Sequence, residues 1–205
     1  MQRERTVSLA TPGDIPEGAA AFARAFYDDP AIMWLLPDDA KRLSQLTKLY
    51  ALILEETMRV DFYETYTTDD HAGLAIWGRP GAWEPPTKMM LPLIPRMLRI
   101  LGLRCFLRYM RVMQQLKKVH PEEPHWYLAG LGTDPPKQRI GVGRSLIAPV
   151  LARCDAEGLP AYLETQKPEN LPYYEWFGFR VTGEIDLPKG GPHLWLMWRD
   201  PALTP

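Results

Sequence analysis

A pair of glycines, Gly141 and Gly143, separates a β-rich run from a helix-like run, and this junction constrains the fold more than any other stretch. The β-rich run covers 124–134, and apolar residues recur at helical spacing over 142–154. Backbone N–H groups at the start of a helix have no intrahelical partner and lie at its positive end, so they bind anions, phosphate above all. Glycine also lets the chain turn sharply and lets a ligand approach closely.

Two interpretations of this junction stay open from its residues alone. The glycines could only relieve crowding in a turn, or they could form a cradle for a phosphorylated cofactor. Arg139 and Arg144 flank the glycines and could add charge-assisted contacts to a phosphate. The order Q-x-x-G-x-G, which starts at Gln138, is neither G-x-G-x-x-G nor G-x-x-x-x-G-K-[ST]. The dinucleotide-binding and P-loop interpretations therefore lack their residues.

Apolar spacing along the rest of the chain predicts alternating helices and strands. The predicted order is βαα-ββ-α-β-α-β-α-ββ, which is that of a mixed α/β domain. The predicted elements are a strand over 5–10, a helix from Ile15 that Pro30 closes, a helix from about Asp38 to Arg59, a hairpin around Asp69–Asp70, a helical segment over Leu91–Lys118 bent near Pro95 and Gly102, the strand 124–134, the helix after the glycines, a strand over PAYLETQ, a short helix ending at Gly178 and an antiparallel pair around Gly190.

Length and charge limit the classes of protein to which the chain can belong. A length of 205 residues suits one domain, 1–205, and is enough for a full core. The formal net charge of −1 argues against nucleic acid as a partner. No apolar stretch approaches the ~20 residues that span a bilayer, and the N-terminus has no apolar signal core. We therefore expect a cytoplasmic protein without a membrane partner, either a monomer or a homodimer.

Cysteines and histidines give no sign of a disulfide or a metal site. Cys105 and Cys154 lie in apolar, helix-like runs, where buried free thiols are expected. His71, His120 and His193 have no partners at the spacing typical of metal ligands. We therefore predict no bound metal.

The segment Leu91–Lys118 alternates leucine and methionine with arginine and lysine. A basic amphipathic helix of this kind is typical of a membrane-surface helix. The favoured alternative is a helix packed on the domain with its arginines in solvent, because such residues need no special partner. A third alternative is that the apolar side of this helical insertion covers a substrate site.

A second motif follows further along the chain, in the stretch ENLPYYEWFGF. Tyr174, Gly178 and Phe179 form a Y-x-x-x-G-F pattern there. With the Q-x-x-G-x-G junction before it, this pattern resembles the GNAT superfamily of acyl-CoA-dependent N-acyltransferases. The stretches PHWYLAGLGTDP and PAYLET and the proline inside the intervening helix look like the puromycin N-acetyltransferase branch. The resemblance covers most of the chain and is weak across Leu91–Lys118.

The resemblance implies a fold and a cofactor. The fold is a central, mostly antiparallel mixed sheet that splays open between two parallel strands and is flanked by helices. Acetyl-CoA is the implied co-substrate, and the backbone of the first parallel strand pairs with its pantetheine arm like an added strand. The implied cofactor-binding residues are Leu131, Gly132 and Thr133 for the pantetheine arm, Gln138 as the leading polar residue of the motif, Arg139, Ile140, Gly141, Val142, Gly143, Arg144 and Ser145 for the pyrophosphate, and Asn170 near the exit of the next strand.

The resemblance also implies a direct transfer in which Tyr174 is the general acid for the departing thiolate. A phenol of pKa ~10 can protonate a thiolate of pKa ~8.5 when it is held within reach. Tyr173 is the fallback, and packing of a helix on the sheet is the alternative role of Tyr174. The amine must lose a proton, and Glu164 in YLET is our first candidate for the base. The other candidates are His125, Asp28 and Asp29.

Three functions remain in view from the sequence. The first is acetylation of the primary amine of a small molecule. The second is acetylation of a protein or peptide amine, which needs an open groove. The third is a non-catalytic acyl-CoA-binding module, in which the glycine junction works and Tyr174 only packs.

Overall fold

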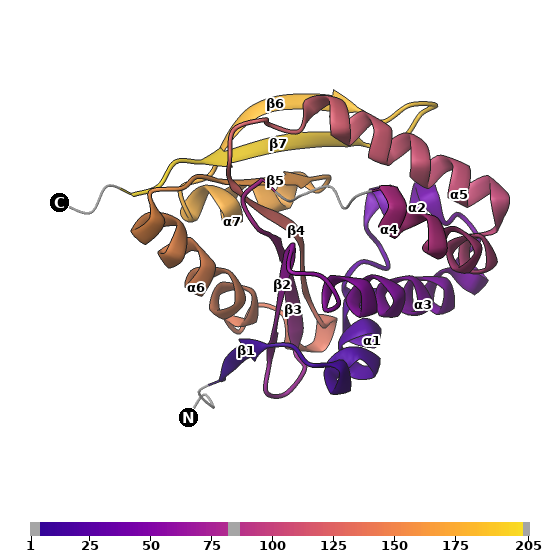
Figure 1. Ribbon diagram of the computed structural model, residues 1–205, viewed down its shortest axis with the longest axis horizontal. Coiled ribbons are helices and arrows are strands. Elements are labelled where there is room, and N and C mark those ends of the chain that lie inside the picture. The colour runs from indigo at the N-terminus through magenta and orange to yellow at the C-terminus, as the bar shows by residue number, and fades with distance from the viewer. Residues whose placement is uncertain (1–4, 82–86, 203–205) are drawn as a thin grey trace.

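The strands expected from the sequence assemble into one seven-stranded sheet in the order β1-β2-β3-β4-β5-β7-β6 (Figure 1). This computed structural model describes residues 5–81 and 87–202. Every neighbouring pair is antiparallel except β4 and β5, which run parallel. The strands are β1 (Val7–Leu9), β2 (Tyr63–Thr68), β3 (Gly73–Gly78), β4 (Trp126–Thr133), β5 (Ala161–Thr165), β6 (Arg180–Asp186) and β7 (His193–Arg199).

Helices cover both faces of the sheet, with α6 and α7 on one side and α1, α3 and α5 on the other (Figure 1). Short 3-10 turns precede several of them. The α-helices are α1 (Ile15–Ala25), α2 (Pro30–Leu35), α3 (Asp39–Thr57), α4 (Thr87–Met90), α5 (Ile94–Val119), α6 (Val142–Glu157) and α7 (Leu171–Trp176). The predicted mixed α/β class and the predicted sheet are confirmed, whereas α2 and the short helix α4 are additional to the predicted order.

Strand β3 shows how the sequence divides the core between the two faces. Successive side chains on a strand point to opposite faces. Ala75 and Trp77 pack with the α6 side, whereas Leu74 and Ile76 pack with the α1 and α3 side. All of these side chains are buried, so β3 lies in the centre of the sheet with a core on each face.

The prediction that Pro30 ends the first helical segment is wrong. The α1 helix stops at Ala25, and Pro30 is the first residue of α2. The Asp29 carboxylate accepts hydrogen bonds from the N–H groups of Ala31 and Ile32 and so caps α2. Aspartate followed by proline is a common start of a helix, because proline lacks only an N–H that has no partner there.

The predicted bend in the segment Leu91–Lys118 is confirmed at Gly102. This residue has φ 72° and ψ 162° inside α5, which is otherwise helical from Ile94 to Val119. Hydrogen bonds tie α5 to the helices beneath it: the Gln45 side chain donates to the carbonyl of Ile100, and Arg108 donates to that of Trp34.

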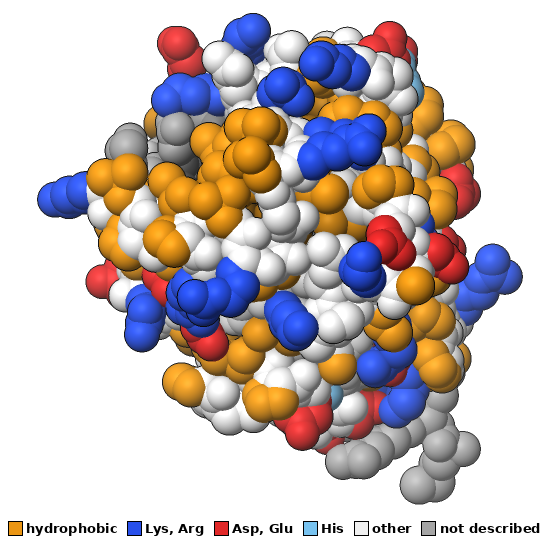
Figure 2. All heavy atoms as spheres, turned by 90° about the vertical axis from the view of Figure 1, so that its right-hand side faces the viewer, with side chains coloured by type: hydrophobic (Ala, Val, Ile, Leu, Met, Phe, Trp, Pro, Cys, Tyr) orange, Lys and Arg blue, Asp and Glu red, His pale blue; other side chains and the backbone are white. Residues whose placement is uncertain are grey.

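The outer side of α5 combines apolar and cationic side chains. Leu103, Leu107 and Met110 are 66%, 43% and 46% exposed. The helix carries seven arginines and lysines and no aspartate or glutamate. Figure 2 shows hydrophobic side chains interspersed with Lys and Arg on the face that the helices opposite α6 form. No helix among residues 5–81 and 87–202 is long and apolar enough to cross a membrane.

The two parallel strands separate after a short contact, as the resemblance implies. Only two pairs join them in register, Trp126 with Ala161 and Tyr127 with Tyr162. Beyond this point β4 remains paired with β3 through to Thr133. The edge of β4 that faces β5 is therefore open over its last residues.

A bulge in β4 lies at the start of this opening. Ile76 pairs with Gly130 and Trp77 with Leu128, so Ala129 is an extra residue in β4. The bulge turns the following glycines toward α1, where a Cβ on Gly132 would lie 2.6 Å from the ring of Phe22. Glycine at this position lets α1 pack close to the strand.

Candidate active site

The glycine junction, defined as Gln138–Ser145, forms the start of α6, where no side chain caps the first backbone N–H groups. Arg139 and Gly141 both have positive φ angles, 62° and 90°. Gly141 is the N-cap residue, no side chain caps the helix, and its first turn has no acidic residue. The first N–H groups of α6 thus meet the requirements of an anion site. The donor set fits the pyrophosphate of coenzyme A.

Close packing of α7 against α6 explains why Gly143 has no side chain. A Cβ at this position would lie 2.8 Å from the hydroxyl oxygen of Tyr173. One residue further on, the guanidinium of Arg144 lies 4.6 Å from the ring centroid of Trp176. The cation–π contact and the missing Cβ bring α7 beside the junction.

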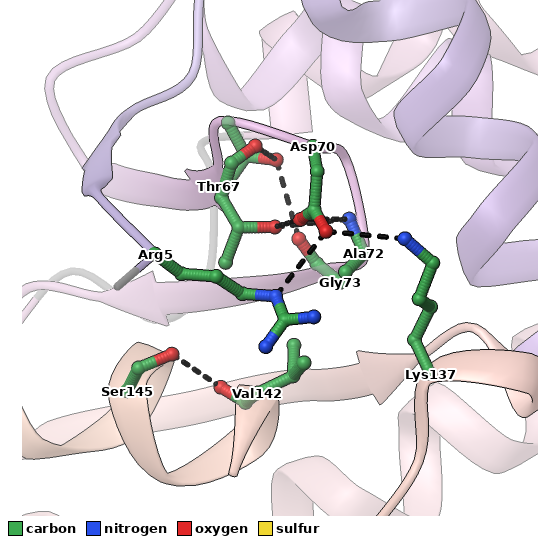
Figure 3. A network of polar contacts seen from close by, with 9 residues as sticks. Arg5, Thr67, Asp70, Ala72, Gly73, Lys137, Val142 and Ser145 are labelled. Carbon is green, nitrogen blue, oxygen red and sulfur yellow. Dashed lines mark hydrogen bonds and ion pairs between the residues drawn. The ribbon is translucent and has the colours of Figure 1, made fainter. Parts of the chain in front are cut away.

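Polar contacts fix the segment that leads into the junction (Figure 3). The Asp70 carboxylate accepts hydrogen bonds from Lys137, at 3.1 Å, and from Arg5, at 3.2 Å. These cations and the Thr68 hydroxyl hold the pKa of Asp70 far below its usual range, although burial acts against them. At the helix start, the Ser145 hydroxyl donates to the carbonyl of Val142.

The other predicted cofactor-binding residues lie along the opening between β4 and β5. Leu131, Gly132 and Thr133 form the end of β4 whose β5-facing edge is open. The Gln138 amide donates to the carbonyl of Thr133 at 3.1 Å, which links the junction to that strand. Across the opening, the Asn170 amide donates to the Thr165 hydroxyl at the end of β5. The structure thus brings the predicted set around one opening.

Tyr174 lies on α7 with its side chain in the core beside α6. The residue is 8% exposed, and its ring packs with those of Tyr173 and Phe179. Burial raises the pKa of Tyr174 far above the usual value for a phenol, and the charges of Tyr173 and Asp29 add to this rise. The hydroxyl therefore stays protonated at neutral pH and can only give up its proton to a strong base.

Glu164 points to the opposite face of the sheet from α6, two residues beyond the last β4–β5 pair. Its side chain is only 6% exposed, and one carboxylate oxygen accepts a hydrogen bond from the Tyr127 hydroxyl at 2.9 Å. Burial raises the pKa of Glu164 to about 7, against the opposing effect of the hydroxyls of Tyr127 and Tyr162. A carboxylate of this pKa is suited to take a proton near neutral pH.

Aromatic and imidazole rings surround this carboxylate and form a group that we call the Glu164 cluster. Nδ1 of His120 lies 4.0 Å from the Glu164 carboxylate, and His120 packs edge-on against Tyr127 and Tyr162. His125 packs on His120 in turn. The cluster consists of Glu164, Tyr127, Tyr162, His120 and His125.

The two aspartates proposed as alternative bases have structural partners. Asp29 is 6% exposed and caps α2, and burial raises its pKa. Asp28 accepts a hydrogen bond from Lys167 at 2.7 Å. The carboxylate of Asp29 is therefore occupied as a helix cap. His125, the remaining candidate base, is buried and only 4% exposed.

The sequence analysis missed His120, Tyr127 and Tyr162 as members of the site. The stretch HPEEPHWY brings His120, His125 and Tyr127 together within a few residues, and that concentration was the available signal.

Cys154 lies buried on α6, where burial raises the pKa of its thiol to about 12. This thiol is not a nucleophile at neutral pH.

The open parallel strand pair and the glycine-started helix are the features that the resemblance to acyl-CoA-dependent acyltransferases implies. The chain belongs to the GNAT acetyltransferase family and is an acyl-CoA-dependent N-acetyltransferase. A family model described as the acetyltransferase (GNAT) family matches residues 99–179. An uncharacterized N-acetyltransferase of Schizosaccharomyces pombe is 30% identical over 200 residues, which cover 92% of this chain and 80% of that protein.

Solved structures agree with this assignment. A structure described as histone acetyltransferase HPA2 and related acetyltransferase, from Corynebacterium glutamicum, is 25% identical, covers 98% of each chain and has a TM-score of 0.73. Arylalkylamine N-acetyltransferase 2 of Aedes aegypti is 13% identical, covers 97% of this chain and 99% of its own, and has a TM-score of 0.61. The Aedes structure is similar in fold alone. The resemblance to the puromycin branch goes beyond these matches and stays a prediction.

Proposed function

We propose that this enzyme moves the acetyl group of acetyl-CoA to the primary amine of a small molecule by direct attack. One observation carries the proposal: a nearly enclosed carboxylate, Glu164, lies beside the opening between β4 and β5 with its pKa raised to about 7. The glycine junction lies at the other side of the same opening. The acetyl-CoA site and the base are thus assigned to two sides of the opening between β4 and β5.

On the donor side, the residues act by binding and by giving a proton. Acetyl-CoA supplies the thioester that the amine attacks. The N–H groups from Arg139 to Ser145 hold the pyrophosphate, and the open edge of β4 from Leu131 to Thr133 aligns the pantetheine arm. Tyr174 donates its phenolic proton to the departing sulfur. Its place in the Y-x-x-x-G-F motif supports this role. Its raised pKa keeps the proton on the oxygen at neutral pH and also makes the phenol a weaker acid toward the sulfur.

On the acceptor side, Glu164 takes the proton from the amine nitrogen, which frees the lone pair for attack on the thioester carbon. Backbone N–H groups of the bulged strand β4 then polarise the carbonyl. One C–N bond forms and one C–S bond breaks. The second proton that the nitrogen loses replaces the one that Tyr174 gave to sulfur, and no acyl-enzyme is required. No three His, Cys, Asp or Glu side chains gather as metal ligands in the described part of the chain.

The surroundings of Glu164 favour a small acceptor over a protein tail. Its side chain is 6% exposed and lies among the rings of Tyr127, Tyr162 and His120. The α5 insertion is tied to α2 and α3 on the same face, which supports the idea that it covers the acceptor site. A flat groove would be needed for an extended peptide.

The test combines binding and turnover. Calorimetry with acetyl-CoA is expected to show micromolar binding, and release of free thiol is expected with small primary amines. A peptide panel with free N-termini and lysines is the comparison. Turnover with peptides alone would contradict the acceptor class, and binding without turnover on any amine would favour the acyl-CoA-binding module.

A further inference from the structure

Packing against the domain explains only one side of α5. Leu101 and Phe106 are buried beneath the helix. Leu103, Leu107 and Met110 are exposed, and their spacing of four and then three residues places them in one row along the outer side. Exposed apolar side chains that gather in one place mark a surface that binds something apolar.

Cationic side chains flank this row. Arg104 and Arg111 each follow a member of the row by one position, which places them ~100° further round the helix. Neither has a carboxylate partner in the described part of the chain. Two other arginines of the helix differ, because Arg96 pairs with a glutamate of α3 and Arg108 donates to a carbonyl of α2. Arg104 and Arg111 are thus available to an external anion.

The helices beside α5 also expose apolar side chains. Met33 on α2 and Leu43 on α3 are exposed, and both helices contact α5. Figure 2 shows hydrophobic side chains next to Lys and Arg on the side of the molecule that these helices form. A surface of this kind is suited to a partner that has both apolar and anionic parts.

Three kinds of partner meet these two requirements to different degrees. A second copy of the chain would bring the same patch against itself in a two-fold interface, so that cations would face cations. A nucleic acid would contact the cations through its phosphates and leave the apolar row in water. An anionic bilayer takes up both, because apolar side chains enter the boundary of headgroups and acyl chains while Lys and Arg contact the phosphates.

We propose that the outer side of α5 binds the surface of an anionic phospholipid bilayer, with the helix parallel to that surface. Leu103, Leu107 and Met110 enter the boundary between headgroups and acyl chains. Arg104 and Arg111 lie at the level of the lipid phosphates. The binding is peripheral: the helix lies on the bilayer and does not cross it.

This proposal differs from the interpretation that the sequence favours. The sequence alone favours solvated arginines and predicts no membrane partner, because it does not show which side of a basic amphipathic helix faces the domain. The structure places three large apolar side chains on the outer side, where they pack against no core. This placement changes the preference. The inference goes beyond the proposed function and does not depend on it.

The first test compares vesicles of two compositions. Phosphatidylcholine vesicles with and without about 30% phosphatidylserine are sedimented with the wild-type protein. We expect the partition coefficient to be at least about tenfold higher with phosphatidylserine, and to fall at least about tenfold between about 0.1 M and about 0.5 M salt. Equal binding to both compositions, or binding to neither, would overturn the proposal.

The second test removes the apolar row. Leu103→Gln with Leu107→Gln replaces two side chains that enter the bilayer, and we expect the partition coefficient to fall at least about tenfold. Leu9→Gln with Val181→Gln is the matched control, because it replaces two exposed apolar residues on the edge strands β1 and β6. The control should keep wild-type binding. Circular dichroism and urea unfolding show that the compared variants are folded.

The third test removes the flanking cations. Arg104→Gln with Arg111→Gln should lower the partition coefficient about tenfold and make it less sensitive to salt. Arg153→Gln with Arg180→Gln makes the same change of charge on α6 and β6 and should bind like the wild-type protein. An equal loss in this control would show that only the overall charge matters, and the proposed surface would be wrong.

The outcomes also separate a membrane from a soluble polyanion. If a short DNA duplex displaces the protein from vesicles and the leucine variant binds both like the wild-type protein, the cations serve a soluble polyanion and the proposal fails. None of these measurements uses acetyl transfer. An inactive wild-type protein that binds vesicles would contradict only the proposed function, and an active one that does not bind them would contradict only the membrane surface.

Discussion

The glycine junction and the Glu164 cluster lie at the same opening in the sheet but are built in opposite ways. The junction is one continuous stretch that offers backbone donors without a side-chain cap. The cluster draws its side chains from the end of α5, from β4 and from β5, and hides them from solvent. Backbone sites can be read from adjacent residues, whereas a side-chain site exists only once distant strands have paired. The comparison teaches that the donor half of such an enzyme is easier to infer than the acceptor half.

The largest effect is expected from Glu164→Gln, which keeps the shape of the side chain and removes the base. We expect kcat to fall about 10²- to 10³-fold, with acetyl-CoA affinity unchanged because the junction lies elsewhere. In the wild-type protein, the rate should rise with pH through about 7 as Glu164 loses its proton. Thiol release across pH 5–9 measures both. Glu169→Gln, on the exposed turn after β5, is the control, and a wild-type rate in Glu164→Gln would remove this residue as the base.

The same variant should be more stable than the wild-type protein at high pH. The pKa of Glu164 is about 7 in the folded state against 4.5 for the free side chain, so its contribution to stability is complete below about pH 4.5 and is lost as pH rises to about 7. We therefore expect Glu164→Gln to gain on the order of 3 kcal/mol over the wild-type protein at pH 8 and much less at pH 5. Urea unfolding at the two pH values measures the difference. An equal gain in stability at both pH values would show that burial does not raise the pKa of the Glu164 carboxylate.

Tyr174→Phe tests the acetyl-CoA side of the opening, where the Tyr174 side chain is proposed to protonate the departing sulfur. Without the phenolic proton, the thiolate must leave unprotonated, and we expect kcat to fall about tenfold to a hundredfold. Tyr173→Phe, at the neighbouring ring, should have the smaller effect. Steady-state rates of the two variants decide the assignment, and the reverse order would transfer the role to Tyr173.

The smallest effect is expected at the junction backbone. In Gly143→Ala the new Cβ would lie 2.8 Å from the Tyr173 hydroxyl and narrow the approach to the helix start, so acetyl-CoA affinity should fall about tenfold. Gly158 at the other end of α6 has φ 66° and open space around it. Gly158→Ala should therefore cost about 1–2 kcal/mol of stability and leave affinity unchanged. Calorimetry measures the acetyl-CoA affinity of both variants, and urea unfolding measures their stability. An unchanged affinity in Gly143→Ala or a reduced affinity in Gly158→Ala would contradict the prediction.

Local patterns were enough to predict most of the fold. The hairpin of β2 and β3, the long helix α3 and the closing pair β6 and β7 all follow from spacing and turn residues. The helix α2 was missed because Pro30 was interpreted as a terminator, and proline alone does not say whether it ends or begins a helix. Only the preceding Asp29, with its capping carboxylate, separates the two cases.

Prediction of the site stopped where packing decides. Glu164 could be named from the strand PAYLET. The burial of its side chain, however, depends on the pairing of β4 with β5, which brings Tyr127 to it, and on the end of α5, which brings His120. His120 lies in a loop after a helix whose kink at Gly102 no sequence rule places in space. The raised pKa of Glu164 comes from burial, which is a property of the assembled sheet and of no single segment.

The seven cations of α5 have a consequence for how the molecule behaves in an electric field. The whole chain carries a formal net charge of −1, so the residues outside α5 together carry −8. Charge is therefore divided unevenly between one helix and the rest of the chain, despite a calculated isoelectric point of about 6.4. At a pH slightly above that point the protein should still be retained by a cation-exchange resin, oriented with α5 toward the matrix.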